Sequence, residues 1–146
     1  MEVTRRGFTL IELLVVVSII GMLASVILAS VSSARNKASD AAVKSNLRNL
    51  TVQAALYQSD HGSYGPTLAA ATCPTSGTSM FFADAKVYSL LTAAEEAGGS
   101  GSRCASNGTN FAVSVQMRSS TNHWCVDSQS AAKEISNTSW SGVACP

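Results

Sequence analysis

One carboxylate stands at the start of a long uncharged apolar run. Glu12 precedes Leu13, and no charged residue occurs from Leu13 to Ala34. Placing a charged side chain inside a hydrocarbon layer costs about 2.5 kcal/mol or more. Glu12 is therefore expected to have a partner or a function. The alternative is a carboxylate that reaches the polar edge of a bilayer and needs neither.

The cysteines are the second group of residues able to do chemistry. They are Cys73, Cys104, Cys125 and Cys145, all beyond the apolar run, and none forms a CxxC pair, so zinc is not expected. An even number of cysteines beyond a membrane segment favours two disulfides in an oxidising compartment. Among the three possible connectivities we select the sequential one, Cys73–Cys104 and Cys125–Cys145. The alternative is four reduced cysteines in a core.

Other kinds of site have little support. His61 and His123 are isolated in the sequence, and there is no Ser/His/Asp, Cys/His or phosphate-binding pattern. The formal net charge is +1 and aromatic residues make up 6% of the chain, so neither a basic field nor a stacking platform for nucleic acid is indicated. We expect no enzyme activity, no cofactor, no metal and no nucleic-acid partner.

The segment Gly7–Glu12, Gly-Phe-Thr-Leu-Ile-Glu after Arg5 and Arg6, closely resembles the class III signal of type IV prepilins and type II secretion pseudopilins. The resemblance implies cleavage after Gly7 by a prepilin peptidase and N-methylation of the new N-terminus, Phe8. It also implies that Glu12 meets the Phe8 amine of a neighbouring subunit during assembly. A disulfide near the C-terminus, here Cys125–Cys145, resembles the loop staple of many pilins.

One departure from the family pattern lies within the apolar run. Pilins of this type commonly carry a proline in its second half, where this chain has Ala29. Ala29 also belongs to a series of small residues at four-residue spacing, Gly21, Ser25, Ala29 and Ser33. Small residues at this spacing let helices approach closely in an apolar medium. Small residues are frequent in membrane helices in any case.

These residues must be carried by a long helix. No proline occurs between positions 8 and 65, and Val43, Leu47, Leu50, Ala54 and Tyr57 form one helical stripe. We predict a leader over 1–7, an apolar membrane and assembly helix over 8–34, and an extracytoplasmic domain over 35–146 that begins with amphipathic helix 35–61. A helix from position 8 to about 61 is roughly 80 Å long. Lipid or other subunits must cover the part that a small domain leaves unpacked.

The remaining elements are shorter. The sequence predicts a helix over Asp84–Ala97, a loop over 98–110, and a half-buried strand over Phe111–Met117 with alternate residues inside. A second strand is predicted over His123–Asp127, and residues 133–135 and 139–143 are expected to add a third short strand. The predicted fold class is α+β and pilin-like, with the second half of the long helix packed on a small antiparallel sheet and with disulfide-tied loops.

The function implied by the resemblance is structural. The chain would be a single-pass precursor in the inner membrane with a cytoplasmic N-terminus, and then a subunit of an extracellular filament. Its partners would be copies of itself, other pilins, the peptidase and an assembly platform. A pseudopilin of a secretion or competence system is the nearest alternative. An alternative of another class is a secreted binding module cleaved after Ser32-Ser33-Ala34, whose N-terminus would be Arg35 instead of Phe8.

Overall fold

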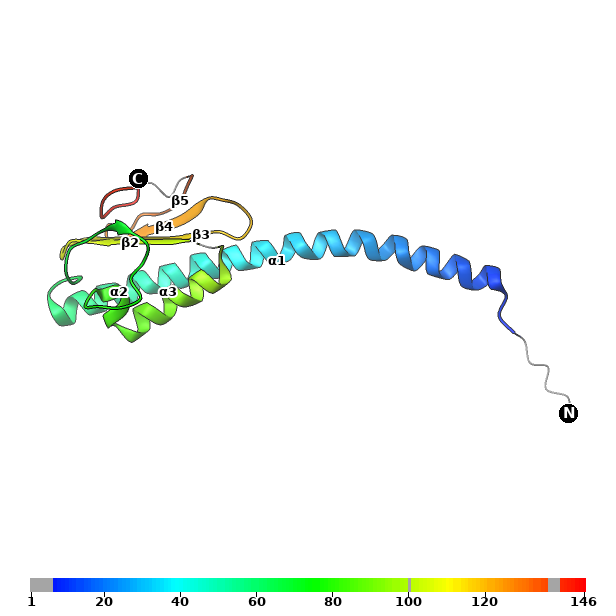
Figure 1. The fold of residues 1–146 in the computed structure, drawn as a ribbon, viewed down its shortest axis with the longest axis horizontal. Helices are drawn as coiled ribbons and strands as arrows, with labels where there is room; N and C mark the ends of the chain where they lie inside the picture. The colour runs from blue at the N-terminus through cyan, green and yellow to red at the C-terminus, as the bar shows by residue number, and fades with distance from the viewer. Residues whose placement is uncertain (1–6, 100, 137–139) are drawn as a thin grey trace, which may run out of the picture. The chain divides into compact units, whose positions relative to one another are not determined.

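The computed structural model describes residues 7–99, 101–136 and 140–146. The chain divides into two compact units, Met1–Arg35 (unit 1) and Asn36–Pro146 (unit 2). Helix α1 (Leu10–His61) contributes residues to both units (Figure 1). A helix over this stretch agrees with the prediction apart from its first two residues. It ends where Gly62 follows with φ of +70°, a backbone region that favours glycine.

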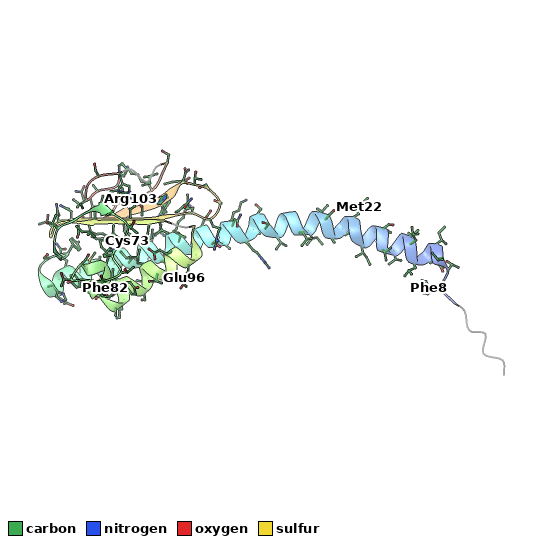
Figure 2. All side chains as sticks on the ribbon, in the orientation of Figure 1. Phe8, Met22, Cys73, Phe82, Glu96 and Arg103 are labelled. Carbon is green, nitrogen blue, oxygen red and sulfur yellow. A yellow bond between two sulfur atoms is a disulfide. The ribbon has the colours of Figure 1, made fainter. Side chains whose placement is uncertain are left out.

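Unit 1 presents an apolar surface. Every large apolar side chain from Phe8 to Val31 is at least 41% exposed. Figure 2 labels two of them, Phe8 just before the helix and Met22 on it. Among the described residues, α1 is the one helix long and apolar enough to cross a membrane. A surface of this kind is unfavourable in water, so it is normally covered by lipid or by other apolar helices.

Unit 2 is built on a five-stranded antiparallel sheet with the strand order β1-β2-β3-β4-β5. The strands are β1 (Leu68–Ala71), β2 (Ser102–Ser106), β3 (Phe111–Gln116), β4 (His123–Asp127) and β5 (Ala132–Ile135). Each strand pairs with its neighbours in the chain, so the sheet is a meander (Figure 1). Cys104 is paired with Val113, and Val113 with Val126, across the three central strands. The unit also contains the helices α2 (Met80–Ala83) and α3 (Ala85–Ala97).

The predicted helical stripe forms the main core. Four of its positions are fully buried: Val43, Leu47, Leu50 and Ala54. They belong to one cluster with Val113 of the sheet and Leu91 of α3. Side chains four and three residues apart share one helix face, which explains why these four positions meet the sheet together. The α+β, pilin-like architecture predicted from the sequence is confirmed.

The opposite face of the sheet is also covered, which corrects one prediction. β3 was expected to be half-buried, but Ala112 and Ser114 are buried as fully as Phe111 and Val113. A second cluster lies on their side, and its members are Ala105, Ala112, Cys125, Ile135 and Trp140. The C-terminal segment lies over this face because the Cys125–Cys145 disulfide holds it there.

Three further elements differ from the prediction. The segment 98–110 was expected to be a loop, yet Ser102–Ser106 form β2, which pairs on both sides. Its small residues have weak strand propensity, and partners on either side outweigh that preference. Helix α2 and strand β1 were not predicted. Of the residues expected to add a third strand, 133–135 belong to β5 (Ala132–Ile135), whereas 140–143 are not in a strand and 139 lies outside the described residues.

The structure has two disulfides, Cys73–Cys104 and Cys125–Cys145, which correspond to the sequential connectivity. Their Cα–Cα distances are 4.8 and 5.9 Å, within the range that the bond requires. The first joins the segment after β1 to β2, and the second joins β4 to the chain end. Both therefore restrain irregular segments that make few backbone hydrogen bonds of their own.

Candidate functional site

Glu12 is hydrogen bonded at the very start of α1. Its Oε2 accepts from the backbone N–H of Thr9 at 2.8 Å and from Thr9 Oγ1 at 2.6 Å. The backbone N–H of Glu12 in turn donates to Thr9 Oγ1 at 3.3 Å. Because α1 begins at Leu10, Thr9 occupies the N-cap position and Glu12 the third helical position. This reciprocal pair is a capping box.

The capping box explains how Glu12 is oriented. The first turn of a helix leaves backbone N–H groups without helical acceptors, and a carboxylate there also interacts favourably with the helix dipole. Sequence reasoning treated Glu12 as an acid without a local partner and missed Thr9. The signal was present, since Thr9-Leu10-Ile11-Glu12 has the T-x-x-E pattern of a capping box before an apolar run.

The surface around Glu12 is apolar. A shallow groove of about 370 Å³ is lined by Phe8, Ile11, Glu12, Val15 and Val16. Phe8 is 85% exposed. The groove therefore offers one carboxylate within an otherwise apolar helix surface, an arrangement suited to receiving an apolar segment that carries one cation.

Gly7 precedes this groove in open surroundings. A Cβ built on Gly7 meets no atom within 4 Å, so nothing within the described chain requires glycine there for lack of space. The basic residues of the predicted leader, Arg5 and Arg6, lie outside the described residues, as does the rest of 1–6. The role assigned to Gly7 and Phe8 as a cleavage site stays a prediction.

The series of small residues lies along the same helix. Gly21 has open space where a Cβ would be, and Ser25 Oγ donates to the Met22 carbonyl at 2.8 Å. Ser33 is exposed. The side chain of Ala29 lies outside the described residues, while its backbone belongs to α1. The role of this series in helix packing stays a prediction.

Asp40 and His123 are two of the buried ionisable residues of unit 2, which also include Asp127. Burial raises the pKa of the Asp40 carboxyl, but hydrogen bonds from Ser119 and Arg118 and the charge of Lys44 outweigh it and lower the pKa overall. Burial and the nearby Arg103 charge lower the pKa of His123. Within the described part of the chain, no three His, Cys, Asp or Glu side chains are grouped in a way that suits a metal ion.

Comparison with known proteins agrees with the N-terminal features. Residues 4–28 match the family model of the prokaryotic N-terminal methylation motif. The chain is 42% identical over 65 residues to the type IV wide pilus major component PilA4 of Thermus thermophilus. The match covers 44% of this chain and spans half the length of PilA4. No solved structure matches.

Proposed function

We propose that this chain, which carries the N-terminal methylation motif and is similar to the pilus component PilA4, is a membrane-anchored pilin precursor that is processed after Gly7 and polymerises through the first part of α1. The observation that carries the proposal is the apolar surface of unit 1. Its large side chains are exposed from Phe8 to Val31, with a single hydrogen-bonded carboxylate, Glu12, near the start.

Processing would convert this end of the helix into a charged pair. Cleavage between Gly7 and Phe8 by a prepilin peptidase exposes a cationic amine four residues before Glu12. The family pattern assigns N-methylation to this amine, and methylation preserves its charge. In an apolar filament core an unpaired charge is strongly penalised, so amine and carboxylate of adjacent subunits are expected to pair. The pairing would set the register between subunits.

Thr9 gives Glu12 a partner before assembly. The carboxylate accepts two hydrogen bonds from Thr9 and so is not left unsatisfied in the lone precursor. A carboxylate oxygen has room for further donors, which allows the amine of a neighbouring subunit to join without breaking the cap. When subunits leave the membrane, neighbouring helices replace lipid as the cover of the apolar surface.

The proposed location follows from the same segment. Arg5 and Arg6 before the apolar run favour a cytoplasmic N-terminus. Unit 2, with its two disulfides, would then face the oxidising side of the membrane and later the filament surface. Its partners would be copies of itself, other pilins, the prepilin peptidase and an assembly platform. A pseudopilin would share these steps, but PilA4 is named a pilus component, which favours a pilus.

The proposal is tested by comparing Glu12→Val with Glu12→Gln and wild type in a host that makes filaments from this chain. Ser18→Val is a matched control, because it removes a polar group from the same apolar segment without changing charge. We expect the Glu12 variants to insert in the membrane at least as well as wild type, and filament yield in the sheared fraction to decrease at least about tenfold. Ser18→Val should form filaments normally.

Two results would contradict the proposal. Abundant filaments from Glu12→Val would show that no charge pairing is needed for assembly. A mature N-terminus at Arg35 instead of Phe8, found by mass spectrometry of the wild-type protein, would show that an ordinary signal peptide is removed, as in a secreted binding module.

A further inference from the structure

A cleft lies on the face of the sheet that is opposite α1. It has a volume of about 320 Å³ and runs between β1 and the C-terminal segment Trp140–Val143. β2 contributes Arg103 and Ser106 to its lining. The cleft lies wholly within unit 2, and it plays no part in the proposed assembly through the first part of α1.

Alternation along β2 places Arg103 in this cleft. Cys104 faces the main core, whereas Ala105 belongs to the second cluster, so Arg103 shares the side of Ala105. Figure 2 labels Arg103 on the part of unit 2 that carries the sheet, away from Phe82 and Glu96 of the helical layer. The side chain is partly buried.

The guanidinium of Arg103 is only partly satisfied. One Nη2 hydrogen bond goes to the Ala70 carbonyl at 2.8 Å, while the buried Nε has no hydrogen-bond partner. No Asp or Glu is among the described residues that line the cleft. Arg103 therefore has a backbone carbonyl as its acceptor and no carboxylate beside it in the cleft.

A partly buried cation without a counterion is unfavourable, and proteins normally pair such a group. The charge of Arg103 is felt by its neighbours, because together with burial it lowers the pKa of buried His123. His123 does not line the cleft, and the direction of this shift disfavours its charged form. Among the described residues that line the cleft, Arg103 is the one charged side chain, which suits an anion with one negative charge.

The walls of the cleft combine polar and apolar groups and are well supported. Leu68, Ala69, Ala70 and Val143 make much of the surface apolar. Thr67, Asn107 and Ser141 contribute hydroxyl or amide groups to its lining. Trp140 is held by a hydrogen bond from its Nε1 to Ser114 Oγ at 3.2 Å. The Cys125–Cys145 disulfide anchors the same C-terminal segment. A preformed site loses less conformational freedom when a ligand binds.

We propose that this cleft binds a hexuronic acid residue of an acidic polysaccharide, with Arg103 donating to the sugar carboxylate and the lining hydroxyl and amide groups contacting the ring hydroxyls. A guanidinium matches a carboxylate in charge and offers several N–H donors to its oxygens. The volume is near the lower limit of small-molecule sites, which fits one sugar ring. The inference does not depend on the proposed filament function.

The full chain in detergent micelles provides the test. Trp140 lines the cleft, and the chain has 2 tryptophans, so Trp124→Phe leaves Trp140 as the single fluorescent reporter. In this background, fluorescence is titrated with glucuronate, with glucose at equal concentration, and with acetate. The variants are Arg103→Gln, Arg103→Lys and, as a control for charge alone, Lys133→Gln, whose side chain is exposed on β5.

Saturable binding of glucuronate, tighter than that of glucose and of acetate, is the expected result. Arg103→Gln should weaken it at least about tenfold, as the loss of a hydrogen bond to a charged group does. Arg103→Lys should bind with intermediate affinity, and Lys133→Gln should bind like wild type. Near-UV circular dichroism establishes that each variant is folded, and Arg103→Lys keeps the test valid if Arg103→Gln does not fold.

Several results would overturn the inference. Equal binding of glucose would show that the carboxylate is not recognised, and equal binding of acetate would show that the sugar ring is not. Unchanged affinity in both Arg103 variants would place the site elsewhere. Absence of saturable binding, or self-association of the chain that depends on Arg103, would mean that no sugar occupies the cleft.

Discussion

Replacing Asp40 with alanine should lower the free energy of unfolding of unit 2 by about 2–4 kcal/mol. Asp40 is 8% exposed on α1, and its Oδ1 accepts from the backbone N–H groups of Arg118 at 2.6 Å and Ser119 at 3.2 Å. These donors lie just after β3, so one carboxylate joins the helix to the connection between β3 and β4. Hydrogen bonds to a charged acceptor contribute about 1.5–3 kcal/mol each.

The size of the effect depends on what replaces the carboxylate. Alanine leaves both N–H groups without this acceptor, and water at the edge of the site offsets part of the loss. Asp40→Asn retains one acceptor oxygen but not the charge, so it should cost about half as much. Asp60→Asn, an exposed acid on the same helix, should change stability by about 0.5 kcal/mol or less.

The pH dependence provides a second measurement. The pKa of Asp40 is lower in the folded protein than its usual value. A group with a depressed pKa stabilises the fold above its unfolded pKa, and this stabilisation is lost as the pH falls through the folded pKa. The difference between wild type and Asp40→Asn should therefore be constant near neutral pH and shrink below about pH 4.

Thermal unfolding of the full chain in detergent, with both disulfides oxidised, measures these differences by near-UV circular dichroism. A loss of about 3 kcal/mol corresponds to a decrease in Tm of roughly 10 °C in a domain of this size. The reasoning is refuted if Asp40→Ala costs no more than Asp60→Asn. It is also refuted if the advantage of wild type over Asp40→Asn persists unchanged at pH 2.

Three further predictions concern processing, the helix cap and the second disulfide. Gly7→Val has open space for its side chain, so the chain should fold and insert but remain full length by mass spectrometry; normal maturation would exclude a role for Gly7. Thr9→Val removes the cap and one partner of Glu12, at a cost of about 1 kcal/mol to the helix start. Thr9→Val should lower filament yield less than Glu12→Val does, and Thr9→Ser should restore the yield. A wild-type yield from Thr9→Val would show that the cap does not position Glu12. Replacing Cys125 and Cys145 together with serine should lower stability by about 3 kcal/mol, and non-reducing peptide maps of wild type should link these two cysteines; a different linkage would exclude the pairing.

The sequence by itself determined the features that are local along the chain. The apolar run, the absence of proline and the helical stripe Val43–Ala54 defined α1 nearly to its ends. Periodicity of this kind reflects contacts between residues a few positions apart, so it can be read without knowing the fold. The same holds for α3, where Asp84 caps the helix by accepting from Lys86 and Val87 N–H groups, and for β4, which was predicted over its observed residues.

Only the tertiary structure decided what depends on distant segments. β2 consists mainly of small residues, which form a strand because β1 and β3 pair with them. β3 is buried on both faces because a C-terminal segment crosses the sheet, held by Cys125–Cys145. Arg103 acquires its partly satisfied environment from the same arrangement. Burial by a segment remote in sequence leaves no periodic trace, whereas burial of one helix face does, and this difference separates the two sets of features.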